Sequence, residues 1–215
     1  MKYDLLGRPV LTPAQKRAEQ EAEAAAYAQG AAEYEQVQAL LKQGHLAEAQ
    51  RVARTVTGVD HRNTAIKAVA LAQVQAGDLP AAIATSRPIS YTNSREEVVE
   101  AVIKVLLTQG EVVAALLLAA TVVGFGYVSI HELIATTQQQ LGHAEAARRT
   151  LLLARDYAHS IDLENAIDGY YQSFYLGHVA KAQVRLGDVT GAIQTAHLIN
   201  EPNTRQATLE AIGQV

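Results

Sequence analysis

The chain has 215 residues, 49% of them hydrophobic but only 5% aromatic, so any core must be packed chiefly through Ala, Leu and Val side chains. Its formal net charge of −4 gives no basic field, which argues against nucleic acid as a partner. The absence of cysteine excludes disulfides and thiolate chemistry.

The first 30 residues predict an arm followed by a helix. Residues 1–11 lack the uninterrupted apolar core of a secretory leader, so we expect an extended arm and a cytoplasmic location. At Thr12 a helix start follows, because Thr12 can cap the helix and Gln15 can reach back to close a capping box. We expect this helix to end before Gly30 and to form a solvated cap over residues 12–30. The alternative is a helix that docks on a partner.

From residue 31 to residue 215 one pattern recurs five times. Each copy contains a glycine, and the five are separated by 33, 33, 32 and 45 residues: Gly44, Gly77, Gly110, Gly142 and Gly187. A fixed period of this length is typical of stacked helix pairs. Glycine adopts a left-handed backbone cheaply, so each of the five is predicted to end a helix. The fourth repeat is predicted to begin near Tyr127. The last step is longer, which we assign to a long second helix over 144–159 and an insertion near 158–172.

Small and apolar residues recur at fixed distances from each glycine. An alanine stands five residues after every one: Ala49, Ala82, Ala115, Ala147 and Ala192. Small or apolar residues also occur nine and twelve residues after each glycine and seven before it. Steps of three and four place these residues on one helix face, with small residues where two backbones approach closely. We therefore predict an all-α fold of about eleven or twelve antiparallel helices, each pair burying its apolar face against the next pair.

These positions resemble the tetratricopeptide repeat (TPR) family. The matching features are the turn glycine with a polar residue after it, the alanine five residues on, the apolar residue twelve on, and the small residue seven before at Ala70, Ala135 and Ala180. The resemblance covers 31–215 and implies a TPR-like α-solenoid of about five and a half helix-turn-helix repeats in a right-handed superhelix. It also implies a non-catalytic scaffold for protein–protein interaction. Since the chain has no tryptophan, a related two-helix solenoid is the alternative.

The resemblance further implies where a ligand would bind, because the first helix of each TPR unit lines a concave groove. Counting back 13, 10, 6 and 2 residues from each glycine gives the expected groove positions. Together with the adjacent Tyr171, the candidate ligand-binding residues are Tyr34, Gln38, Lys67, Glu100, Lys104, Glu132, Tyr171, Phe174, Lys181 and Arg185. The cations among them would bind acidic groups of a protein or peptide, and the aromatic residues would hold its apolar side chains. The family's carboxylate clamp pairs Lys with Asn; Lys67 matches it, whereas Leu71 stands in place of the Asn. An exposed polar groove without a partner is the alternative.

Motifs for catalysis and metal binding are incomplete. His131-Glu132-Leu133-Ile134-Ala135 begins like a zinc-protease helix but lacks the second histidine. No Gly-x-Ser-x-Gly elbow is present, and no glycine loop follows a predicted strand. We expect no catalytic residues, cofactor or metal. A pocket among Tyr170, Tyr171 and Tyr175 is the one place where a small molecule is a candidate ligand.

The run from Val112 to Ile130 contains 19 residues without a formal charge. Its length could span a bilayer, but its glycine and alanine spacing matches the other repeats. We therefore predict a buried central helix and do not favour a membrane partner. If part of this run is exposed, it predicts self-association. A structural subunit that forms a homo-oligomer or joins a larger assembly through these central repeats and the N-terminal arm is therefore the alternative function.

Overall fold

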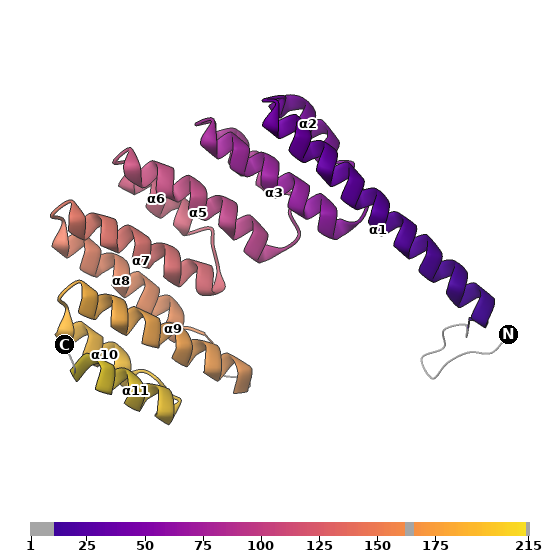
Figure 1. The fold of residues 1–215 in the computed structure, drawn as a ribbon. Helices are drawn as coiled ribbons and strands as arrows, with labels where there is room; N and C mark the ends of the chain where they lie inside the picture. The colour runs from indigo at the N-terminus through magenta and orange to yellow at the C-terminus, as the bar shows by residue number, and fades with distance from the viewer. Residues whose placement is uncertain (1–10, 162–165, 214–215) are drawn as a thin grey trace. The chain divides into compact units, whose positions relative to one another are not determined.

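The computed structural model describes residues 11–161 and 166–213, which form eleven α-helices and no strand (Figure 1). The predicted all-α class is confirmed. The predicted arm over 1–11 lies outside the described residues except for Leu11. The chain divides into an N-terminal unit, Met1–Val98, and a C-terminal unit, Val99–Val215. Within the described part of the chain, no helix has the length and apolar character that crossing a membrane requires.

The N-terminal unit contains four helices and the start of a fifth. They are α1 (Pro13–Lys42), α2 (Leu46–Ala53), α3 (Val59–Gln75), α4 (Leu79–Ser86) and the first residues of α5 (Thr92–Thr108). Helix α1 packs against α2 and α3, and α3 packs against α2 and α4. The predicted capping box is present, since Thr12 and Gln15 hydrogen-bond each other's backbone N–H groups at the start of α1.

The C-terminal unit holds the rest of α5 and six further helices. They are α6 (Val112–Ala119), α7 (Gly124–Gln140), α8 (Ala144–His159), α9 (Ala166–Arg185), α10 (Val189–His197) and α11 (Pro202–Gly213). Consecutive helices from α6 to α11 are in contact, and α9 also contacts α7 and α11. The predicted long helix over 144–159 is confirmed as α8. Of the insertion near 158–172, residues 162–165 lie outside the described part, and residues from Ala166 onward begin α9.

The five predicted turn glycines all have a left-handed backbone, with φ between 78° and 83°. The same two hydrogen bonds close each turn. In the second repeat, the N–H of Asp78 donates to the carbonyl of Gln73 (3.0 Å) and the N–H of Gly77 donates to the carbonyl of Val74 (3.0 Å). This is the Schellman motif, which satisfies carbonyl groups that the helix end would otherwise leave unpaired. One backbone geometry therefore ends the first helix of every repeat.

The four predicted core positions of each repeat are buried in all five repeats. The alanines five residues after the glycines are 0% exposed, and no residue at the other three positions exceeds 5%. Alanine at the central position lets the two helices of a pair approach closely, and larger residues such as Ile103, Leu151 and Ile199 fill the space around it. The periodic pattern in the sequence is therefore the pattern of the core.

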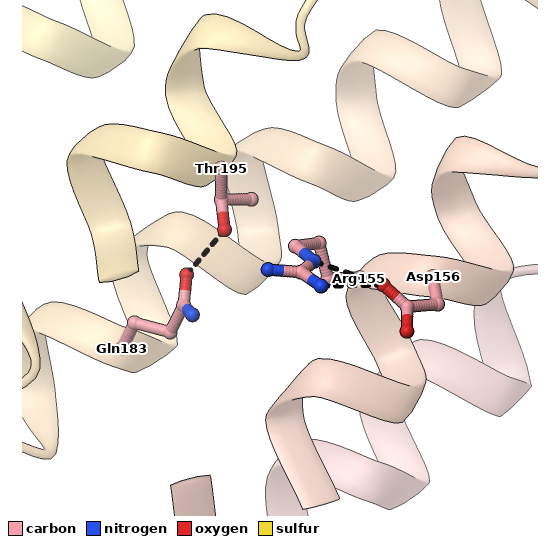
Figure 2. A network of polar contacts seen from close by, with 4 residues as sticks. All are labelled: Arg155, Asp156, Gln183 and Thr195. Carbon is pink, nitrogen blue, oxygen red and sulfur yellow. Dashed lines mark hydrogen bonds and ion pairs between the residues drawn. The ribbon is translucent and has the colours of Figure 1, made fainter. Parts of the chain in front are cut away.

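A buried Gln–Thr pair joins the two helices in some repeats and was not predicted. The Thr150 hydroxyl donates to Oε1 of Gln138, and the Thr195 hydroxyl donates to Oε1 of Gln183, both at 2.7 Å. Figure 2 shows the second pair, together with the ion pair between Arg155 and Asp156 of α8. Each Gln lies four residues before its turn glycine and each Thr eight after it.

Where the Gln is absent, the Thr is absent too. Repeats one and three carry apolar residues at both positions, Leu40 with Val52 and Leu106 with Leu118. Repeat two carries Gln73 and Thr85 at these positions, but there the Thr85 hydroxyl accepts from Nε2 of Gln50 (2.9 Å). The two positions thus change from polar to apolar together.

Helix α1 does not end before Gly30, so the predicted helix boundary there is wrong. Gly30 is buried in the middle of α1, and a Cβ on it would lie 2.2 Å from the Thr57 carbonyl oxygen and 2.8 Å from Nδ1 of His61. The glycine is therefore needed for close approach of α1 to the α2–α3 connection. The part of α1 before it, 13–29, is exposed. In the same way, α7 begins at Gly124, although we expected its repeat to begin near Tyr127.

The central uncharged run is only partly buried, which corrects the prediction of a buried helix. In α6, Ala115 and Ala119 are fully buried, but Val113 and Leu117 are 72% and 71% exposed. The two pairs lie on opposite sides of the helix, so α6 faces the core with its alanines and presents an apolar outer surface.

The close approach at Gly30 predicts the sign of a substitution. Helix propensity alone would make Gly30→Ala stabilising by about 1 kcal/mol. The contact with Thr57 predicts instead a destabilisation of about 1–3 kcal/mol, as for overpacked sites. Urea unfolding followed by circular dichroism measures the difference, and a gain in stability would contradict the close approach.

The Gln–Thr pair predicts a non-additive double-mutant cycle. Thr195→Val leaves Oε1 of Gln183 buried and unpaired, which should lower the free energy of unfolding by about 1–3 kcal/mol. Adding Gln183→Leu reproduces the Leu40–Val52 pair of repeat one and should recover part of that loss. Urea unfolding of the two single variants and the double variant tests this, and strictly additive effects would contradict it.

Candidate functional site

The predicted groove residues all lie on the first helices of the repeats and are accessible. Exposed members are Lys104, Tyr171, Phe174, Lys181 and Arg185, and half-buried members are Tyr34, Gln38, Lys67, Glu100 and Glu132. They fall into two groups. Tyr34, Gln38 and Lys67 belong to the N-terminal unit, and the other seven belong to the C-terminal unit.

In the N-terminal unit the predicted residues are held by their neighbours. The amide Nε2 of Gln38 donates to the hydroxyl of Tyr34 one turn earlier on α1 (2.7 Å). Lys67 on α3 forms an ion pair with Glu97 on α5, with 2.7 Å between Nζ and Oε2. An acidic ligand at Lys67 would have to displace this carboxylate.

Two of the three predicted cations in the C-terminal unit are also paired. Lys104 contacts Glu100 one turn earlier on α5, with 2.6 Å between Nζ and Oε1. Arg185 on α9 pairs with Glu132 on α7. Lys181 is exposed and forms no ion pair or side-chain hydrogen bond with the residues that the structure describes. Of the four cations expected to bind acidic groups, Lys181 alone is therefore unengaged within the described residues.

A group of aromatic side chains lies on the solvent-exposed surface of α7 and α9. We define the aromatic surface as Phe125, Tyr170, Tyr171, Phe174 and His178. The ring centroid of Phe125 lies 5.4 Å from that of Phe174 and 5.0 Å from that of His178, and Phe174 lies 4.6 Å from His178. Tyr170 stacks near Phe174 at 6.2 Å and contacts Tyr171 at 5.8 Å.

The helical spacing of the sequence builds this surface. Tyr170, Phe174 and His178 follow one another at intervals of four residues, so they share one face of α9. Phe125 comes from the first turn of α7, which packs against α9. It contacts both Phe174 and His178, so residues distant in the sequence form one continuous set of rings.

The exposure of this surface is its most distinctive property. Phe125 and Phe174, the two phenylalanines of the chain, are 39% and 38% exposed, while Tyr170 and Tyr171 are 60% and 46% exposed. Phenylalanine is usually among the buried residues, and here the core is made of aliphatic residues instead. A contiguous exposed aromatic patch is typical of an interaction site.

Charged residues border the aromatic surface and act on His178. Burial against the neighbouring rings lowers the pKa of His178, the negative charge of Glu132 raises it, and the positive charges of Lys181 and Arg185 lower it. The net effect is a pKa below the ordinary value of 6.5, so the imidazole is uncharged at neutral pH. His178 therefore acts as a neutral ring within the aromatic surface.

The second ring stack in this unit belongs to the core. His131 is 2% exposed, its ring lies 3.9 Å from that of Tyr127, and its Nδ1 is 2.8 Å from the Tyr127 carbonyl oxygen. The ring of Tyr127 also stacks on Tyr157 at 4.3 Å. Burial lowers the pKa of His131, so it is neutral. The histidine of the His-Glu motif therefore packs inside the helix bundle. No group of three or more possible metal ligands occurs among the described residues.

Ring contacts join the three tyrosines that suggested a small-molecule pocket, since the ring centroid of Tyr171 lies 5.8 Å from that of Tyr170 and 6.0 Å from that of Tyr175, but their burial differs. Tyr175 is 8% exposed and packs in the core beside Leu176 and Val128, whereas Tyr170 and Tyr171 lie on the surface.

A shallow depression of about 340 Å³ lies between α5 and α7. Its lining residues are Lys104, Leu107, Thr108, Leu133, Thr137 and Gln140. Lys104, one of the predicted groove residues, therefore borders this depression.

Counting positions in the sequence missed Phe125 and His178. Phe125 and Tyr170 each lie 17 residues before their turn glycine, one helical turn earlier than the first position we counted. Tyr27 occupies the same position in repeat one, and this recurrence of an aromatic residue was the available signal for Phe125. It was missed because α7 begins earlier than the repeat pattern alone predicted.

Comparison with protein-family models, with curated proteins and with solved structures finds no match for this chain. The resemblance to TPR proteins therefore rests on the repeat positions themselves.

The environment of His178 predicts opposite shifts for two substitutions. Phe174→Ala removes a ring that buries the imidazole and should raise the pKa of His178 towards 6.5. Glu132→Gln removes a negative charge and should lower this pKa further. Titration of the His178 ring signals by NMR measures both, and shifts of the same sign would contradict this description.

Proposed function

We propose that the protein is a non-catalytic, TPR-type scaffold that binds a protein or peptide segment. In this proposal the helix pairs stack as a right-handed superhelix, and the open side of the first helices forms the binding groove. The single observation that supports binding best is the aromatic surface of α7 and α9, where both phenylalanines of the chain are exposed.

The composition of this surface suits reversible contact with another chain. Large rings supply apolar contact area with few rotatable bonds, so little entropy is lost on binding, and aromatic residues are frequent among binding hot spots. Lys181 and the Glu132–Arg185 ion pair form a polar border. An apolar centre with a polar border is the usual composition of protein–protein interfaces.

A library of twelve-residue peptides displayed on phage and selected on the purified protein tests this function. Selected peptides should bind through the aromatic surface, so Phe174→Ala should weaken them by about tenfold or more, as for a hot-spot residue. Leu153→Ala is the matched control, because Leu153 is 50% exposed but lies on the second helix α8. Equal affinities for both variants would contradict the assignment of the site.

Self-association is the second candidate function, and the outer surface of α6 favours it. Three and seven residues after the turn glycine, repeat three carries Val113 and Leu117. All residues at these two positions in the other repeats are exposed as well, and none is a large apolar residue: Ala47 and Arg51, Pro80 and Ala84, Glu145 and Arg149, Thr190 and Gln194. At these two positions, repeat three alone places large apolar side chains in solvent.

The double substitution Val113→Glu and Leu117→Arg tests self-association, since it gives α6 the outer residues of α8. If α6 mediates self-association, light scattering should show a mass that rises with concentration for the natural protein and a monomer for the variant. A natural protein that stays monomeric at all concentrations would exclude this candidate.

A further inference from the structure

One exposed side of α9 carries both residues of the aromatic surface and Lys181, the cation without an ion pair among the described residues. Tyr170, Phe174, Lys181 and Arg185 are separated by four, seven and four residues, which places them on the same side of the helix. Phe174 is 38% exposed and touches the rings of Phe125 and His178. A ligand lying along this side would meet rings first and then the ammonium group of Lys181.

The charges along this side of α9 favour an acidic group at Lys181. Arg185 is neutralised by Glu132, and His178 is uncharged at neutral pH. Lys181 has no ion pair within the described residues, so it contributes the net positive charge at this end of the aromatic surface. A carboxylate could bind there without displacing an existing partner, unlike at Lys67 or Lys104.

The helix fixes the distance between the two contacts. Phe174 and Lys181 are seven residues apart, which corresponds to about 10 Å along a helix that rises 1.5 Å per residue. A peptide in the polyproline II conformation has three residues per turn and advances about 3.1 Å per residue. Its side chains three positions apart therefore lie on one face, about 9 Å from each other, which matches this distance.

We propose that the placement of Phe174 and Lys181 on one side of α9 selects a peptide in the polyproline II conformation, with an aromatic residue three positions from an acidic one. This inference rests on the proposed function, because it names the peptide that the aromatic surface binds. Phe125, Phe174 and His178 hold the aromatic side chain, and Lys181 binds the carboxylate.

Fluorescence anisotropy with labelled synthetic peptides tests the spacing. The peptides are twelve residues long and contain one Phe and one Glu in an Ala–Ser background, separated by one to six positions. The peptide with a separation of three should bind most tightly, by about tenfold over a separation of one. Equal affinity at all separations would overturn the inference.

A charge exchange tests the role of Lys181. Lys181→Glu should abolish binding of the Phe–Glu peptide and allow binding of the corresponding Phe–Lys peptide. Lys16→Glu makes the same change in net charge near the start of α1, away from the groove positions, and should leave both affinities unchanged. No effect of Lys181→Glu, or an equal effect of Lys16→Glu, would overturn the inference.

The outcomes separate this inference from the function on which it rests. If library-selected peptides bind through Phe174 but carry no acidic residue at the required spacing, the inference fails and the scaffold function stands. If neither the synthetic series nor the library yields a peptide that depends on Phe174, both fail.

Discussion

The left-handed glycine that ends the first helix of each repeat is the constraint on which the rest of the structure depends. The five turns share φ values within a few degrees of one another and the same pair of closing hydrogen bonds. Because the backbone reverses in the same way each time, the alanine five residues later always meets the preceding helix. Close contact at that alanine then lets small aliphatic residues form the core of a chain with few aromatic residues.

The sequence predicted the repeating part of the fold well, because turn geometry and core packing both leave residues at fixed spacing. It failed where the structure depends on contacts between segments that have no fixed spacing. Gly30 has the sequence signature of a helix end, but it is a point of close approach to Thr57. The uncharged α6 has the composition of a buried helix, yet Val113 and Leu117 face solvent. Spacing alone cannot show which side of a uniformly apolar helix is covered.

The candidate site was predicted in part for the same reason. The open side of the first helices follows from the repeat period, so the exposure of Phe174, Lys181 and Arg185 could be anticipated. The ion pairs of Arg185 with Glu132 and of Lys67 with Glu97 join different helices, and their geometry depends on how those helices pack. Because these pairings occupy Arg185 and Lys67, the candidate site is the aromatic surface together with Lys181.

The most direct test of this account is the stability of Gly77→Ala, Gly142→Ala and Gly187→Ala, measured by urea unfolding. At each of these glycines an added Cβ would meet no atom within 4 Å, so the substitution introduces no steric contact. The left-handed backbone alone should lower the free energy of unfolding by about 1–2 kcal/mol at each turn, and by similar amounts in all three. Unchanged or increased stability would contradict the claim that one left-handed turn, repeated along the chain, determines the fold.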